Sequence, residues 1–409
     1  LIAVLLPFRI MRAADVGSLW GDETFSLLIA QMPVNLMLDR TTFDAHPPAY
    51  YLLLRAWLLI AESLGAPPSL LLARIPSLLC WIGLVAIGWF GGQALLGRHP
   101  GMVVGACLAL SEQGAFLSKE LRNYGPATTM LLGAIVVLLL LANHRNSTRA
   151  QRIGWPLYAL LAIAALYLHL LTAIVLFLQG LIWITMLRKA PRSFLIGGFI
   201  AQTAVVIAYL PWLLRLRSQI DYVQSVNLSW MSPPTLTNAF YTFAIWLPQG
   251  RFVDPTVQSQ LPMLLLLGLP TLLPLIGLLR KSNPAVPIGN AQQKKNSDQI
   301  TPNLATVQSH TPESSIDLLR QNAQAALFTA IGFVALTWLI TVLGIVKIFD
   351  GPRYPVLTLG PWIFGLIATA ALLIRTLRLP TATVWIMAVL WGMNGLYGGS
   401  KATGWADDN

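Results

Sequence analysis

Long apolar runs, more than any polar motif, decide what this chain can fold into. Runs of roughly 18–25 apolar residues recur along the sequence, which is the length that a helix needs to cross about 30 Å of hydrocarbon. The chain of 409 residues is 56% hydrophobic and 11% charged, and a water-soluble domain of this size could not bury so much apolar surface. A helix satisfies its backbone polar groups within one segment, as a bilayer requires. The sequence therefore predicts an all-α integral membrane protein.

The apolar runs predict about eleven membrane-spanning helices. Their expected bounds are 1–14, 71–96, 101–117, 125–142, 153–169, 170–187, 193–212, 261–279, 324–346, 355–374 and 381–398. The apolar stretch 49–64 is shorter and carries Arg55 and Glu62, so we expect a juxtamembrane helix that lies in the interface. Because the chain starts at Leu1 with a short run, we interpret it as truncated at both ends and 1–14 as no signal peptide.

The basic residues favour one orientation in the membrane. With a cytoplasmic N-terminus and 49–64 outside the bilayer, the inner loops hold fourteen basic residues and three acidic ones, whereas the outer side is balanced. The positive-inside rule favours this topology, because a crossing by 49–64 would move every later loop to the other side. The net charge of +11 then indicates contact with anionic membrane lipids, not with nucleic acid. We expect the protein to be integral to the cell membrane.

Three hydrophilic segments follow from this topology. Residues 15–70 form the first outer loop, and 213–260 form an outer loop whose aromatic residues fold onto the membrane surface. Residues 281–323, rich in Pro, Asn, Gln, Ser and Thr, are expected to be a mobile cytoplasmic linker with a short helix near 316–321. No internal repeat is found, which disfavours an inverted-repeat transporter.

Ionisable side chains gather in the first outer loop. Asp22 and Glu23 are adjacent, and Asp44 and His46 follow. Adjacent carboxylates push each other's pKa values apart, and an ionised aspartate can take a proton from an acceptor hydroxyl. A solvated loop with a helix start at the acidic pair is the alternative interpretation.

Two histidines are expected on the same side of the membrane. His46 precedes Pro47 and Pro48 at the entry to 49–64, and His169 lies at the outer end of the fifth predicted span. Together with nearby carboxylates they predict a site for a divalent metal ion or for a phosphate. Taken alone, His169 fits a hydrogen-bonded residue of the bundle better than a metal ligand.

Two further outer segments carry cations and tyrosines. They contain Lys119, Glu120, Arg122 and Tyr124, and then Lys347, Asp350, Arg353 and Tyr354. Guanidinium and ammonium groups suit phosphate oxygens near the headgroup level. Pairing of Lys119 with Glu120, and interfacial anchoring by Arg353 and Tyr354, are the alternatives. Since all these elements are expected on one face, they predict a site for an anionic lipid and a second substrate.

The order of these elements resembles the GT-C superfamily of membrane glycosyltransferases, in the branch of the protein O-mannosyltransferases and the lipid A aminoarabinose transferase. The resemblance covers most of the chain. It rests on Asp22-Glu23, His46-Pro47-Pro48 before Tyr50-Tyr51, Arg74-Ile75-Pro76-Ser77, Ser118-Lys119-Glu120-Leu121-Arg122-Asn123-Tyr124, Tyr167-Leu168-His169, Leu210-Pro211-Trp212 and Arg353-Tyr354-Pro355. The chain departs from the family's Tyr-Ser-Gln-Glu-Ala-Arg-x-Tyr segment at Leu117, Lys119 and Leu121, and it stops where many members continue.

The resemblance implies a GT-C-type helical bundle that acts as a glycosyltransferase. Such an enzyme moves one sugar, with inversion, from a polyprenyl-phosphate carrier to a glycan, lipid or protein acceptor on the non-cytoplasmic face of the cell envelope. By analogy Asp22 is the catalytic base or orients the acceptor, and Glu23 supports it. The lipid phosphate would be held by Lys119, Arg122, Tyr124, Arg353 and Tyr354, and His46 and His169 would contact a divalent metal ion or the phosphate.

A transporter or flippase of a lipid-linked sugar is the alternative function. It would also need many helices and cationic contacts to a headgroup. Such a protein, however, places ionisable residues near the bilayer midplane, and the middles of most predicted spans are apolar here.

Overall fold

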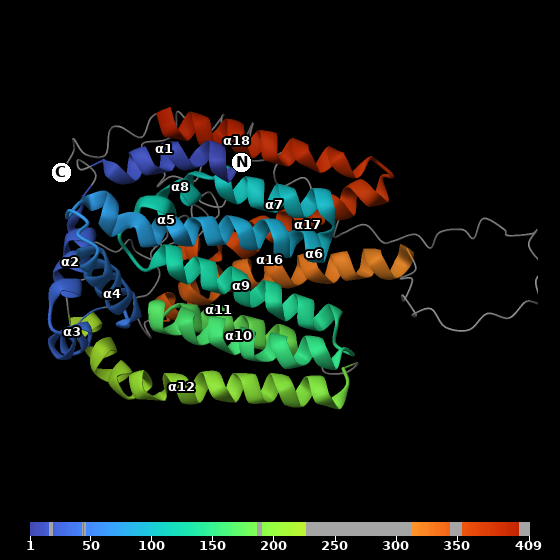
Figure 1. The fold of residues 1–409 in the computed structure, drawn as a ribbon. Helices are drawn as coiled ribbons and strands as arrows, with labels where there is room; N and C mark the ends of the chain where they lie inside the picture. Colours follow the sequence, from blue (N-terminus) through green and yellow to red (C-terminus); the bar gives the residue numbers. More distant parts are fainter. Residues whose placement is uncertain are drawn as a thin grey trace, which may run out of the picture.

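The computed structural model describes residues 1–15, 19–42, 44, 46–185, 190–225, 312–343 and 354–400. Within these residues the regular elements are helices, and no strand is present (Figure 1). The larger helices are α1 (Ile2–Ala14), α2 (Gly21–Gln31), α3 (Val34–Thr41), α4 (Ala49–Ser63), α5 (Leu70–Ala86), α7 (Arg98–Leu110), α8 (Glu112–Lys119), α9 (Tyr124–Asn143), α10 (Thr148–Leu168), α11 (Thr172–Thr185), α12 (Arg192–Ser225), α16 (Pro312–Val342), α17 (Leu359–Thr376) and α18 (Trp385–Ser400). Shorter elements are the π-helical turn η2 (Ile87–Gly91), α6 (Gly92–Leu96) and the 3-10 turns η6 (Tyr354–Thr358) and η7 (Thr381–Val384).

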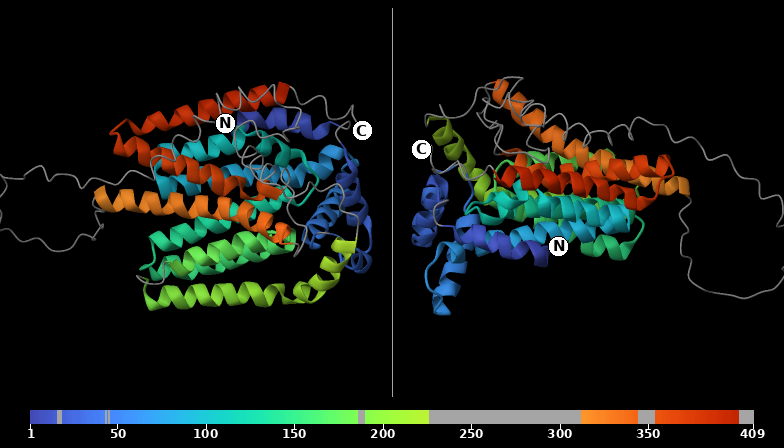
Figure 2. Two further views of the ribbon diagram at one scale, coloured as in Figure 1. Left: turned by 180° about the vertical axis from the view of Figure 1, so that it is seen from behind. Right: turned by 90° about the horizontal axis from the view of Figure 1, so that it is seen from above.

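The long helices form a bundle in which neighbours run side by side (Figures 1 and 2). Six helices of the described part are long and apolar enough to span a membrane: Leu70–Leu96, Tyr124–Asn143, Thr148–Leu168, Arg192–Tyr222, Ile316–Val342 and Val356–Thr376. The apolar segments 172–185 and 381–392 are shorter helices. The prediction of an all-helical membrane protein is confirmed for these residues, while the count of eleven spans stays a prediction. The predicted span 261–279 lies outside the described residues.

The predicted span 101–117 is not one continuous helix. It consists of the pair α7 and α8, which together are long and apolar enough to span a membrane but are bent by 61° relative to each other. The bend arises at Ser111, whose backbone is extended and whose Oγ accepts a hydrogen bond from the Gly114 N–H at 2.9 Å. A serine in this conformation caps a new helix rather than continuing the old one. The second helix thereby points away from the first and delivers Lys119 to the end of the bundle.

Two helices extend beyond their predicted bounds. Helix α12 continues through residues 213–225, which were predicted as the start of an outer loop, and α16 begins at Pro312, inside the predicted linker 281–323. Burial explains both extensions. Gln219 is buried and its Nε2 donates to the Asp44 carbonyl at 2.6 Å, and Asn322 is buried and donates to the Leu95 carbonyl at 3.3 Å. Polar residues that looked like loop sequence are therefore held by tertiary hydrogen bonds.

Helices α2, α3 and α4 form an end layer that lies across one end of the bundle (Figure 1, left). Arg55 of α4 ties this layer together, because its Nη1 donates to the carbonyls of Ala30 and Met32 at 3.2 and 2.8 Å. Trp57 joins the layer to the bundle through a 2.7 Å hydrogen bond to the Leu72 carbonyl. The helix predicted for 49–64 is present as α4, and its juxtamembrane location stays a prediction.

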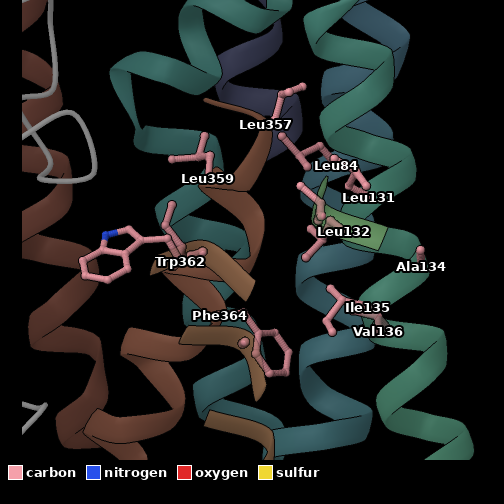
Figure 3. Packing of buried hydrophobic residues seen from close by; sticks show 14 of the residues in the cluster. Leu84, Leu131, Leu132, Ala134, Ile135, Val136, Leu357, Leu359, Trp362 and Phe364 are labelled. Carbon is pink, nitrogen blue, oxygen red and sulfur yellow. The ribbon is translucent and has the colours of Figure 1, made fainter. Parts of the chain in front are cut away.

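Apolar side chains from α5, α9 and α17 fill the centre of the bundle (Figure 3). Leu84, Leu132 and Trp362 are almost wholly inaccessible. Gly365 of α17 lies so close to α16 that an added Cβ would come within 2.7 Å of Leu327 Cγ. Such small-residue contacts let membrane helices approach closely.

Candidate functional site

Polar side chains from seven parts of the chain meet where the end layer covers the bundle. They come from the start of α2, the segment before α4, α4 itself, α5, the α8–α9 junction, the α10–α11 junction and η6. These elements are far apart in the sequence but lie at the same end of the molecule (Figure 1). The residues form two ionic groups and one cluster of rings.

The first ionic group is a buried pair between Glu23 and Arg74. Arg74 Nε and Nη2 donate to the two carboxylate oxygens of Glu23 at 3.1 and 2.7 Å, and each side chain is 1% exposed. Glu23 Oε1 also accepts the Leu121 N–H at 2.7 Å, and Arg74 Nη1 donates to the carbonyls of Ala13 and Asp15. This two-bond geometry is the strong form of the arginine–carboxylate interaction. The pair therefore joins α1, α2, α5 and the α8–α9 junction.

The second ionic group surrounds Arg122. Its Nη2 lies 3.7 Å from Asp22 Oδ2, and its Nη1 lies 3.3 Å from both Ser26 Oγ and Tyr51 OH. The Tyr51 hydroxyl donates to Asp44 Oδ2 at 2.6 Å. Arg122 is 7% exposed at its side chain, whereas the Asp22 side chain is 34% exposed. A buried cation thus lies beside a carboxylate that a solute can reach.

The ring cluster consists of His46, Tyr124, His169 and Tyr354. The ring centroids of His46 and His169 are 4.6 Å apart, and Tyr124 lies 5.4 Å from His169 and 6.1 Å from His46. Tyr354 completes the cluster at 5.6 Å from His169 and 6.5 Å from Tyr124. These residues come from four different elements, so the cluster exists only in the folded bundle.

The hydrogen bond of His169 indicates its tautomer. The Leu171 N–H donates to His169 Nδ1 at 3.2 Å, so Nδ1 carries no proton. Burial, then His46 and Arg122, lower the pKa of His169 well below its ordinary value, which keeps the ring neutral near pH 7. A neutral ring without a proton on Nδ1 carries it on Nε2. That Nε2 is buried and has no hydrogen-bond acceptor among the described residues, so His169 offers an N–H donor.

This geometry bears on the predicted metal site. The two imidazoles lie close together, yet the described residues hold no group of three His, Cys, Asp or Glu side chains suited to a metal ion. Protein zinc sites use three or four such ligands, and the metal site stays a prediction. The Nε2–H of His169 is a hydrogen-bond donor that suits an anionic oxygen.

Burial and charge set the ionisation of the second ionic group. Burial, then the neighbouring Asp44, raise the pKa of Tyr51 well above its ordinary value, so its hydroxyl stays a donor. Burial disfavours the charge on Arg122, but the interactions with its neighbours, including the Asp22 carboxylate, outweigh burial and raise its pKa above the ordinary value. Arg122 is therefore a permanent cation.

The structure brings together most of the residues predicted for the site. Asp22, Arg122, Tyr124, Tyr354, His46 and His169 lie in the second ionic group or the ring cluster. Lys119 is half-buried at the end of α8. Its electrostatic interactions are with Arg74 and Glu23, not with the ring cluster. Arg353 lies outside the described residues.

Sequence reasoning assigned no role to Arg74 or Tyr51. Arg74 had a visible signal, because an arginine within the apolar run 70–86 requires a buried partner. Tyr51 had none, since aromatic residues are common at the ends of membrane helices.

The chain matches no protein-family model, no curated protein and no solved structure. The resemblance to GT-C enzymes therefore rests on the motifs themselves, and the function is argued from the site.

Proposed function

We propose that the protein is a GT-C-type membrane glycosyltransferase, which moves one sugar from a polyprenyl-phosphate carrier to an acceptor on the non-cytoplasmic face. One observation carries the proposal: an accessible carboxylate, Asp22, lies 3.7 Å from the buried cation Arg122, at the end of an apolar helical bundle. A base and a phosphate-binding cation are the two groups that this reaction needs in proximity. The apolar bundle beside them suits the carrier's tail.

In the proposed reaction the acceptor hydroxyl or amine attacks the anomeric carbon of the sugar. The bond between that carbon and the phosphate oxygen breaks, which inverts the anomeric centre, and the polyprenyl phosphate leaves with the bonding electrons. The acceptor's proton passes to the Asp22 carboxylate, which is the partly exposed member of the acidic pair. Glu23 holds the start of α2 through Arg74 and the Leu121 N–H, so its support of Asp22 is positional.

The leaving phosphate gains negative charge, which fixed donors stabilise. Arg122 supplies a permanent charge and His169 an N–H on Nε2. The hydroxyls of Tyr124 and Tyr354 lie in the same ring cluster, and Lys119 and Arg353 are proposed to attract the headgroup from the rim. In this proposal the two histidines contact phosphate, not metal.

The charges at the other end of the bundle support the proposed orientation. Arg149, Arg152 and Arg192 begin α10 and α12, at the end opposite to His169. The positive-inside rule places such residues in the cytoplasm, so the proposed site faces the non-cytoplasmic side.

The decisive experiment measures transfer of radiolabelled sugar from polyprenyl-phosphate hexoses and pentoses in membranes that contain the protein. Asp22→Asn should lower the rate about 100-fold or more, the scale of general base catalysis. Asp39→Asn is the matched control, because Asp39 is an exposed carboxylate on α3 in the same end layer. Equal rates for Asp22→Asn and wild type, with both folded, would contradict the mechanism. Absence of turnover with every donor, combined with movement of a lipid-linked sugar across the bilayer, would favour the flippase.

A chelator distinguishes the two interpretations of the histidines. Because His169 Nδ1 already accepts the Leu171 N–H, we expect EDTA to leave the transfer rate unchanged. Loss of activity in EDTA that added Zn²⁺ or Mn²⁺ restores would instead establish a metal site, and His46→Ala would then show the same loss without EDTA.

A further inference from the structure

A groove of about 640 Å³ runs between the first halves of α10 and α12. On α10 its lining extends from Gln151 to Ala159 and on α12 from Ser193 to Ala204. Helix α10 ends at the ring cluster, and the groove lies along the beginning of α10. The groove is therefore at the opposite end of the bundle from the candidate site (Figure 1). It therefore requires an explanation of its own.

Small residues on both helices create this groove. At Gly197 an added Cβ would overlap the Trp155 ring, so the backbone of α12 rests directly on the indole. Ala159 and Ala204 leave the furrow open beyond that contact. From Ser193 to Ala204 the helix rises about 16 Å, which matches half of the roughly 30 Å hydrocarbon core. The groove is thus as deep as one leaflet.

Positive charge surrounds the mouth of the groove. Arg152 lines it, and the exposed Arg149 and Arg192 lie within one turn along the same two helices. None of the three guanidinium groups makes an ion pair with any described residue. The sequence contains no Asp or Glu between Glu120 and Asp221, so no acidic residue lies near these arginines in the sequence.

The indole of Trp155 forms part of the apolar wall of the groove. It is 5% exposed, and its Nε1 is buried against α12, since an added Cβ at Gly197 would come within 2.6 Å of it. The ring therefore contributes apolar surface to the groove.

We propose that this groove binds an anionic diacyl phospholipid from the leaflet at that end of the bundle. Its acyl chains would lie against Ala159 and Ala204, and its phosphate would lie among Arg149, Arg152 and Arg192. The apolar depth of one leaflet and the cations at its mouth, which make no ion pair with the described residues, agree with this one class of ligand. The site is separate from the proposed catalytic end and does not depend on the proposed function.

Native mass spectrometry of the delipidated protein tests the proposal, with phosphatidylglycerol and phosphatidylcholine as probes. Wild type should retain one phosphatidylglycerol more tightly than phosphatidylcholine. Arg152→Gln should weaken phosphatidylglycerol about fivefold, the effect of one cation near a lipid phosphate. Arg217→Gln, an exposed arginine at the other end of α12, should change nothing.

A second pair of variants tests the groove itself. Ala204→Trp fills its apolar end and should abolish tight retention, whereas Val206→Trp, exposed on the same helix outside the groove, should not. Equal binding of the two lipids by wild type would overturn the anionic specificity. Unchanged retention in Ala204→Trp would overturn the location. Both residues are exposed, so misfolding is not expected, and unfolding curves verify it.

Discussion

Replacing Glu23 with glutamine should destabilise the fold by about 3–5 kcal/mol, the cost of removing one partner from a buried ion pair. Glu23 and Arg74 are each 1% exposed, so water cannot replace the lost charge. A glutamine oxygen in the place of Oε1 can still accept the hydrogen bonds of Arg74 Nε and the Leu121 N–H, but the bond from Arg74 Nη2 to Oε2 is lost. The guanidinium would then stay buried without a counter-charge and with an amide N–H₂ facing its Nη2, which costs free energy.

Unfolding in a mixed-micelle denaturant titration measures this change. Glu62→Gln is the matched control, because Glu62 is exposed at the end of α4 and should change stability by less than about 0.5 kcal/mol. The double variant Glu23→Leu with Arg74→Met replaces the pair by apolar side chains, and such replacements are often neutral or stabilising. We therefore expect it to be more stable than either single variant, with the coupling read from the double-mutant cycle.

The same variants separate support from chemistry. If Glu23 acts only by holding α2, the double variant keeps sugar transfer once it is folded. A Glu23→Gln protein as stable as wild type would refute the reasoning, since it would mean that the buried pair contributes nothing to the fold.

Three other predictions concern the site and its supports. Arg122→Lys replaces the guanidinium group that contacts Ser26 and Tyr51 by a single ammonium group. The KM for the lipid donor should therefore rise about tenfold in transfer assays, while folding is retained. Ser111→Ala removes the cap of α8 and should cost about 1 kcal/mol in unfolding experiments. His169 has a lowered pKa, so its neutral form contributes stability that is present above pH about 6.5 and lost as the pH falls toward the folded pKa. His169→Gln should flatten that part of the stability-against-pH curve, and an unchanged curve would contradict the burial argument.

Hydropathy predicted the long helices well because the bilayer, not the neighbouring helices, selects them. The expected span 125–142 is α9 (Tyr124–Asn143), and 71–96 is the continuous helix Leu70–Leu96. Hydropathy could not predict the bend at Ser111, because one side-chain hydrogen bond to Gly114 decides it within an apolar segment. Single residues determine such helix caps, and a hydropathy value averaged over many residues does not register them.

The candidate site was predictable in part for a related reason. Topology alone assigned Asp22, Arg122 and His169 to one end, and the structure brings them there. Topology could not say which of two adjacent carboxylates points inward. Successive residues of a helix differ by about 100° in direction, so Glu23 faces Arg74 while Asp22 faces outward, and that choice depends on how α2 packs on α5.

Because Glu23 is anchored, its neighbour Asp22 has a fixed backbone, and lengthening that side chain becomes an informative test. Asp22→Glu keeps the negative charge beside Arg122, which lies 3.7 Å from Asp22 Oδ2, but moves the carboxylate outward by one methylene. A base must meet the acceptor's proton within hydrogen-bond reach, and a displacement of about 1 Å can cost on the order of 100-fold in rate. We therefore expect kcat to fall by roughly that factor, with KM for the donor and the unfolding midpoint unchanged. If Asp22 only neutralised Arg122, the longer carboxylate would serve equally well, and a kcat equal to wild type would remove Asp22 from the proposed chemistry while leaving Arg122 as the phosphate-binding cation.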